Sequence, residues 1–342
     1  MSIPLLHSKA VVYGKYVFAT GQKTFLLLPR AVVVQPELTT QLKEKMADIL
    51  FPEFEEHFID HPKGRFYTRI GGAMTAPAVV LLHGFPETHA SWHNIAPALA
   101  QTHRVVCLDL KGYGRSCVVA GDPAHVEYAK RTMAQEVVDV MSTLGHERFT
   151  VIGHDRGALI AYRIALNWPE KIQKIVVMDN LPVSKVWEIM EDNPLVIPHW
   201  RTFALPAYAP EERMTQVYLE EILRVHTADG TLDCFAPEVL ADFRRSWQQP
   251  ERIHAFCEDY RAGAWQDVED DRKDLATGKT ISVPTLVLWG EVFLGRLSES
   301  PLDCWRSTFI PQAQGVEVAG GHFNSEENPQ ETLAALQAFL AA

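Results

Sequence analysis

The sequence predicts an α/β fold, with a mostly parallel sheet, helices on both faces and a helical cap domain. Short segments that are apolar throughout, such as residues 78–82, alternate with segments of helical period. Strands that are apolar on both faces are typical of parallel sheets covered on both sides. The alternation stops between 181 and 279, where the pattern is helical and rich in tryptophan, proline and charge. An insertion of this kind between two strands is expected to lie over the strand ends, where ligands bind.

The expected elements follow one another in a regular order. An opening hairpin is predicted from HFID and RFYTRIGG at residues 57–60 and 65–72. Further strands are predicted within residues 78–85, 104–114, 149–155, 174–180, 284–291 and 315–323. Helices are predicted at residues 128–145, 157–169 and 329–342.

This pattern divides the chain into an N-terminal extension, two core segments and the cap. The expected bounds are 1–45 for the extension, 46–180 and 280–342 for the core, and 181–279 for the cap. The first 36 residues contain four cations and no acid, which suits either a targeting peptide or a plain upstream extension.

Composition excludes several classes of function. The net charge of −11, without a long basic run, argues against nucleic acid and anionic membranes as partners. No apolar stretch reaches the roughly 18–20 residues of a membrane span. The five cysteines are scattered without CxxC spacing, which indicates reduced thiols, a cytoplasmic location and no metal site. No nucleotide-binding fingerprint is present, so no cofactor is expected.

The run Gly153-His154-Asp155-Arg156-Gly157 places an acid where a strand turns sharply into a helix. Such a turn lifts its central side chain above the sheet, and the helix N-terminus favours negative charge there. Asp155 is therefore the candidate nucleophile, although an aspartate at a strand–helix junction can also be a simple N-cap.

Other strand ends supply candidate partners for Asp155. The Phe85 N–H and the Arg156 N–H are expected to form an oxyanion hole above the turn. His322 follows the last strand as the candidate base, and Asp179 is expected to orient it, with Glu291 as the second choice.

A carboxylate nucleophile suits displacement at a saturated carbon. Attack forms an alkyl ester on Asp155, and His322 then activates water that attacks the ester carbonyl. The leaving group must be one that departs from sp³ carbon, either a halide or an opened epoxide.

Several motifs together resemble the α/β-hydrolase superfamily and, within it, the haloacetate (fluoroacetate) dehalogenases. They cover about residues 46–342 and read HGFPETHASWHNIAP, DLKGYGRS, GHDRGA, PHW, CEDYRAGA, PLDCW and GHF. The resemblance implies the α/β-hydrolase fold, with Asp155 as nucleophile, His322 as base and Asp179 as its partner. It also implies that Arg156 binds the substrate carboxylate, that the protein forms a homodimer, and that the leaving halide is held by His199, Trp200 and Tyr260.

One position departs from the family pattern Asp-Arg-Gly-Ala-Arg. Leu159 replaces the second arginine, one helical turn past Asp155 and expected to face the same cleft. A charge-assisted hydrogen bond is worth roughly 1.5–3 kcal/mol, so carboxylate binding is expected to be weaker unless another cation substitutes. Leu159→Arg is accordingly expected to lower KM for haloacetates.

The predicted function is hydrolytic dehalogenation of haloacetate or a related short 2-haloacid, releasing halide and a 2-hydroxy acid. An epoxide hydrolase with the same Asp–His–Asp machinery is the alternative. It needs acidic hydroxyls, for which Tyr260 is one candidate and Tyr162, Tyr208 and Tyr218 are others. In such enzymes the position of Arg156 more often carries an aromatic residue. A small-ligand binding protein without turnover is the third possibility, and the complete triad argues against it.

Overall fold

The computed structural model describes residues 49–194 and 196–342, so the predicted extension 1–45 lies outside the described residues. Eight strands form one sheet in the order β1-β2-β4-β3-β5-β6-β7-β8. The first two strands, β1 (Glu55–His61) and β2 (Gly64–Gly71), form the predicted antiparallel hairpin, and β2 pairs antiparallel with β4. The remaining strands are all parallel: β3 (Ala78–Leu82), β4 (Arg104–Leu108), β5 (Phe149–His154), β6 (Ile172–Met178), β7 (Thr285–Gly290) and β8 (Gln314–Val318).

The central strands are apolar throughout because both faces of the sheet are covered. In β3, Val80 and Leu82 belong to one hydrophobic core, whereas Val79 and Leu81 belong to the other. Successive strand side chains point to opposite faces, so a continuous apolar run supplies both cores. Helices α3 (Lys130–Thr143), α4 (Arg156–Asn167) and α11 (Pro301–Ser307) contribute to the first core, and α2 (Ala96–Leu99) and α13 (Pro329–Ala341) to the second.

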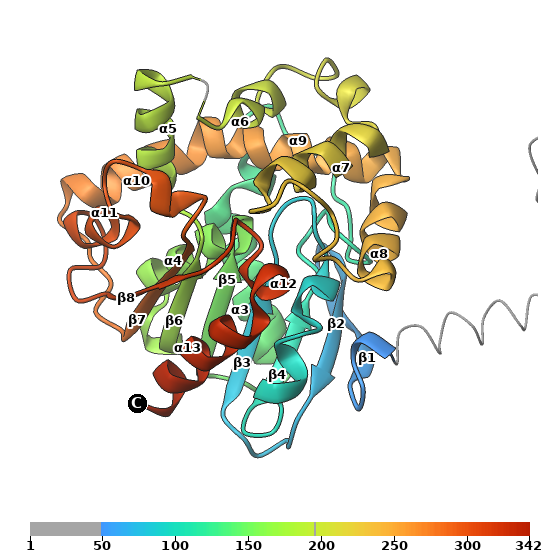
Figure 1. Ribbon diagram of the computed structural model, residues 1–342, viewed down its shortest axis with the longest axis vertical. Helices are drawn as coiled ribbons and strands as arrows, with labels where there is room; N and C mark the ends of the chain where they lie inside the picture. The colour runs from blue at the N-terminus through green and yellow to red at the C-terminus, as the bar shows by residue number, and fades with distance from the viewer. Residues whose placement is uncertain (1–48, 195) are drawn as a thin grey trace, which may run out of the picture. The chain divides into compact units, whose positions relative to one another are not determined.

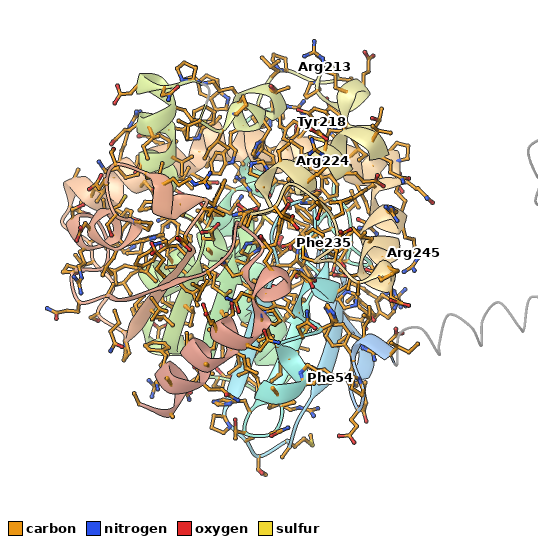
Figure 2. The ribbon with its side chains drawn as sticks, in the orientation of Figure 1. Phe54, Arg213, Tyr218, Arg224, Phe235 and Arg245 are labelled. Atoms are coloured by element: carbon orange, nitrogen blue, oxygen red, sulfur yellow. The ribbon has the colours of Figure 1, made fainter. Side chains whose placement is uncertain are left out.

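Helices also fill the long connection between β6 and β7, which we call the cap segment (residues 183–276). They form a layer above the sheet in Figure 1 and comprise α5 (Val183–Asp192), α6 (Pro198–Phe203), α7 (Gln216–His226), α8 (Pro237–Trp247), α9 (Pro250–Ala264) and α10 (Gln266–Ala276). Figure 2 shows Tyr218 and Arg224 of α7 within this layer and Phe54 near the opposite end of the view. The domain bounds at 181 and 279 stay a prediction.

Short elements complete the described chain. They are α12 (Asn324–Glu327) and the 3-10 turns η1 (His89–Trp92), η2 (Val126–Tyr128), η3 (Pro169–Lys171), η4 (Glu211–Arg213) and η5 (Leu294–Arg296). Across residues 49–194 and 196–342, no helix combines the length and apolar character needed to cross a bilayer.

Candidate active site

The turn between β5 and α4 carries Asp155 in a strained backbone conformation. Its φ is 45° and its ψ is −113°, a region that residues with a Cβ rarely adopt. Two glycines permit the turn: a Cβ on Gly153 would lie 2.2 Å from the Gly157 oxygen, and one on Gly157 would lie 2.2 Å from the Leu82 oxygen. The tight turn therefore holds the Asp155 carboxylate above the sheet, at the N-terminus of α4.

Two donors hold the Asp155 carboxylate from different strand ends. The Phe85 backbone N–H donates to Oδ2 at 2.9 Å, and the Asn180 side-chain amide donates to Oδ1 at 3.0 Å. Sequence reasoning missed Asn180, whose signal was its place at the end of β6, directly after Asp179. Among the described residues, no hydrogen bond joins the Arg156 N–H to this carboxylate. The second donor of the predicted oxyanion hole therefore stays a prediction.

His322 lies between two carboxylates. Its Nδ1 donates to Asp179 Oδ2 at 2.5 Å, and its Nε2 is 3.9 Å from Asp155 Oδ1. Asp179 also accepts the Gly290 N–H at 2.9 Å. Burial raises the pKa of Asp179, while the hydrogen bond from His322 opposes that rise. Glu291, the other predicted acid, is exposed, so Asp179 is the acid that contacts this histidine.

A second buried pair, His154 and Glu87, contacts the backbone of His322. His154 lies 3.0 Å from Glu87 through Nδ1, and its Nε2 donates to the His322 backbone oxygen at 2.8 Å. Burial opposes the positive charge, but Glu87 raises the pKa of His154 to about 9. The same Glu87 carboxylate accepts the Gly84 N–H at 2.8 Å. This pair therefore connects the loop after β3 with the loop that carries His322.

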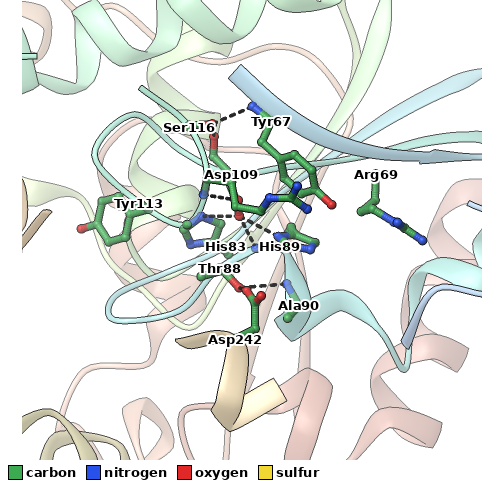
Figure 3. Close-up of polar contacts among 12 residues, drawn as sticks. Tyr67, Arg69, His83, Thr88, His89, Ala90, Asp109, Tyr113, Ser116 and Asp242 are labelled. Carbon is green, nitrogen blue, oxygen red and sulfur yellow. Dashed lines mark hydrogen bonds and ion pairs between the residues drawn. The ribbon is translucent and has the colours of Figure 1, made fainter. Parts of the chain in front are cut away.

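A polar network fixes the loop after β3, as Figure 3 shows. The buried carboxylate of Asp109 accepts the backbone N–H of His89 at 2.7 Å and lies 2.8 Å from its imidazole. His83 accepts the Leu110 N–H at 3.1 Å. Because these contacts join the ends of β3 and β4, they position the Phe85 N–H beside the Asp155 carboxylate.

A cavity of about 230 Å³ opens above Asp155, between the strand ends and the cap segment. The structure brings most of the predicted site residues to its wall: Phe85, Asp155, Asp179, His199, Trp200, Tyr260 and His322. Phe85 and the triad come from strand ends, whereas His199 and Trp200 come from α6 and Tyr260 from α9. Arg156 is the predicted site residue that does not line this cavity.

Three neutral polar rings of the cap segment face one another across the cavity wall. The ring centroid of Tyr260 is 5.9 Å from that of His199 and 5.6 Å from that of Trp200. Burial lowers the pKa of His199 well below its usual value and raises the pKa of Tyr260 well above its own. Within residues 49–194 and 196–342, no protein hydrogen bond engages the Trp200 indole N–H, the Tyr260 hydroxyl or the His199 ring. These polar groups are therefore available to a ligand.

Arg156 lies behind these rings and not at the cavity surface, which differs from the expected contact with a substrate carboxylate. Its Nε donates to Asp259 Oδ2 at 3.1 Å and its Nη2 to Oδ1 at 2.8 Å. Burial disfavours the ionised carboxyl, but Arg156 and Lys130 hold the pKa of Asp259 well below its usual range. The guanidinium carbon is 4.8 Å from the Trp200 ring centroid and 4.3 Å from that of Tyr260. Asp259 thus engages Nε and Nη2 of the cation predicted to bind substrate, whereas its buried Nη1 has no hydrogen-bond partner among the described residues.

The expectation that Leu159 faces the cleft is wrong. Leu159 has no exposed surface, belongs to the sheet–helix core and does not line the cavity. The helical-turn argument fails because Asp155 lies outside the helix with its own φ and ψ, so its side-chain direction is not that of a helical residue. Leu159→Arg would place an unpaired charge in the core and does not offer the expected decrease in KM.

Two further titratable side chains, both missed by sequence reasoning, line the cavity. His226 ends α7, where its Nδ1 donates to the Ile222 oxygen at 2.6 Å, and burial lowers its pKa to about 4. Arg296 ends η5 and is exposed toward solvent. The signal for Arg296 was its place in the loop after β7, since such loops surround the ligand site of a parallel sheet.

Comparison with known proteins agrees with this architecture. A family model described as alpha/beta hydrolase fold matches residues 77–329. Fluoroacetate dehalogenase from Burkholderia sp is 35% identical over 85% of this chain and 95% of its own length. Soluble epoxide hydrolase from Corynebacterium sp. (strain C12) is 27% identical over 77% of this chain and 90% of its own length. A candidate alpha/beta hydrolase structure from Nostoc sp PCC 7120 superposes with a TM-score of 0.81, at 40% identity, covering 85% of this chain and 99% of that one. The chain therefore belongs to the alpha/beta hydrolase fold family.

Proposed function

We propose that the protein hydrolyses the carbon–halogen bond of a halogenated carboxylic acid through an ester on Asp155. The observation that carries the proposal is the pairing of two features in one cavity. Asp155 occupies the strained turn within 3.9 Å of His322, and the free polar groups of His199, Trp200 and Tyr260 line the same wall. The first feature suits attack on carbon, and the second suits an anionic leaving group.

In the first step a carboxylate oxygen of Asp155 forms a bond to the saturated carbon. The carbon–halogen bond breaks, and the halide leaves with the bonding electron pair. Its growing charge is stabilised by the N–H and O–H donors of Trp200 and Tyr260, whose rings are buried. Arg156 lies behind both rings and adds a positive field there, reduced by its partner Asp259.

In the second step water attacks the carbonyl carbon of the ester while His322 Nε2 takes one of its protons. Asp179 stabilises the imidazolium that forms, and the Phe85 N–H stabilises the oxyanion. The acyl carbon–oxygen bond then breaks, and the departing alkoxide takes the proton from His322. The products are a hydroxy acid and Asp155 carrying one oxygen from water.

Isotope transfer and trapping test this sequence of steps. A single turnover of fluoroacetate or chloroacetate in ¹⁸O-water is expected to place the label in the Asp155 side chain, which peptide mass spectrometry detects. His322→Asn is expected to accumulate an ester mass on the peptide that contains Asp155. Label in the product alone, with no adduct in the variant, would refute the proposal.

Epoxide hydrolysis is the second candidate, favoured by the free Tyr260 hydroxyl and by the similarity to the Corynebacterium enzyme. A second acidic hydroxyl is lacking among the tyrosines considered. Tyr162 donates to Asp271, whereas Tyr208 is exposed and Tyr218 lines a neighbouring hollow. Styrene oxide hydrolysis measured beside halide release separates the two activities, and faster epoxide turnover would favour the alternative.

A further inference from the structure

Two opposite charges line the cavity: Asp155 is buried, whereas Arg296 is exposed to solvent. We propose that Arg296 binds the carboxylate of a substrate whose reacting carbon lies several methylene groups away, beside Asp155. The substrate class is then an ω-substituted aliphatic acid and not a 2-haloacid. This inference rests on the proposed function and specifies its substrate.

Arg296 aside, the described residues that line the cavity include no arginine or lysine. Arg156 is bound to Asp259, and Leu159 occupies the core. The cap histidines on the wall, His199 and His226, are neutral because burial lowers the pKa of each. In a 2-haloacid positioned for reaction, the carboxylate is attached directly to the carbon that the anionic Asp155 attacks. Like charges at such short range repel strongly inside a protein.

Arg296 is placed to supply a cation at the solvent-exposed part of the cavity wall. Among the lining residues of the described chain, it is the only arginine or lysine. Its guanidinium has no ion pair or hydrogen bond within residues 49–194 and 196–342. The nearby Glu317 carboxylate accepts the Trp289 indole N–H at 2.8 Å.

The loop that carries Arg296 is fixed at the reaction centre. The Phe293 ring centroid is 4.5 Å from that of His322 and 5.3 Å from that of His226. Leu294 is buried in the core. Because these neighbours anchor both the base and the loop, a substrate that contacts Arg296 is held in a defined position relative to Asp155.

Apolar side chains form much of the cavity wall. They include Leu181, Val186, Ile189, Val196, Ile197 and Leu297. Aliphatic walls favour methylene groups, because each one removed from water contributes to binding, and haloacetate has a single methylene to offer. A water needs only about 10–15 Å³ of cavity space, so the cavity of about 230 Å³ has room for a longer chain than that of haloacetate.

A chain-length series of ω-chloro acids tests the inference. Halide release is measured for chloroacetate, 4-chlorobutyrate and 6-chlorohexanoate, and for 6-chlorohexanamide as the uncharged match. The enzymes compared are the unchanged protein, Arg296→Gln, and Arg213→Gln as the control. Arg213 is an exposed arginine of η4 in the cap segment (Figure 2). It does not line the cavity.

We expect kcat/KM for 6-chlorohexanoate to exceed that for chloroacetate by at least about tenfold. Arg296→Gln is expected to lower kcat/KM for 6-chlorohexanoate about tenfold at low salt, mainly through KM, and to leave the amide unchanged. Arg213→Gln is expected to change neither.

Two outcomes would overturn the inference: chloroacetate remains the best substrate, or Arg296→Gln affects acid and amide alike. Adduct formation in His322→Asn separates this failure from failure of the proposed function. An ester on Asp155 with chloroacetate leaves the dehalogenase proposal intact. No ester with any member of the series would remove both proposals.

Discussion

The cavity has two sides, which we call the floor, formed by residues at the strand ends, and the roof, formed by residues of the cap segment. The two sides differ in whether their polar groups have hydrogen-bond partners within the protein. On the floor, Asp155, His322 and Asp179 are bonded to one another or to neighbouring loops. On the roof, Trp200 and Tyr260 present polar groups without a protein partner among the described residues. Hydrogen bonds within the protein hold the polar groups of the floor in a fixed geometry, which suits the stabilisation of a reaction intermediate. The polar groups of the roof lack protein partners and can bind a ligand. The floor is therefore expected to govern chemistry and the roof selectivity.

The largest expected effect concerns Asp155, the proposed nucleophile on the floor. Asp155→Asn is expected to reduce halide release on the order of 10⁴-fold or more, because the amide cannot form the ester. Steady-state halide release measures the effect, and circular dichroism checks the fold. Asp60→Asn, an exposed change on β1, is the matched control. Residual activity within tenfold of the unchanged protein would contradict the assignment.

Behind the roof, the Arg156–Asp259 pair is expected to serve stability more than chemistry. Asp259→Asn leaves two buried cations, Arg156 and Lys130, without this carboxylate and is expected to lower the free energy of unfolding by about 3–5 kcal/mol. Urea denaturation measures the loss. Asp270→Asn is the control, since its partner Arg131 is half-exposed, and a loss of at most about 1 kcal/mol is expected there. Equal losses in the two variants would contradict this interpretation.

Beneath the floor, the His154–Glu87 pair predicts a pH dependence of stability. The pKa of His154 is raised from 6.5 to about 9 in the folded protein. Its contribution is therefore complete below about pH 6.5 and is lost as the pH rises through 9. We expect His154→Gln to remove a contribution of at most about 3 kcal/mol at pH 6 and almost nothing at pH 10. Denaturation at both pH values measures the difference, and a pH-independent difference would argue against a charged His154.

The smallest expected effect tests the roof. Tyr260→Phe removes one donor and is expected to slow ester formation by about tenfold to a hundredfold, more for fluoride than for bromide. Rapid-quench measurement of the Asp155 adduct isolates this step from ester hydrolysis. Tyr218→Phe, on the neighbouring hollow, is the control. A loss that is the same for every halogen would indicate a packing role for Tyr260.

Much of the floor was predictable from the sequence. Asp155 and Asp179 follow apolar strands, His322 lies in the loop after the last strand, and parallel strands bring their carboxyl ends to one edge of the sheet. Asn180 was missed because an amide at a strand end is usually a turn residue. The cap pair His199-Trp200 and Tyr260 entered through family motifs, since a helical pattern does not tell which side chains face a cavity.

The sequence by itself determined the order of strands and helices, the strained turn at Asp155 and the residues at the strand ends. These features depend on local backbone chemistry and on the short-range period of apolar residues. Only the tertiary structure decided which partners Arg156 and Arg296 contact. Arg156 meets Asp259, a residue 103 positions away on α9, and Arg296 reaches the cavity through a loop packed on His322. A buried arginine is neutralised by whichever carboxylate the packing of distant helices brings to it, and no local pattern records that encounter.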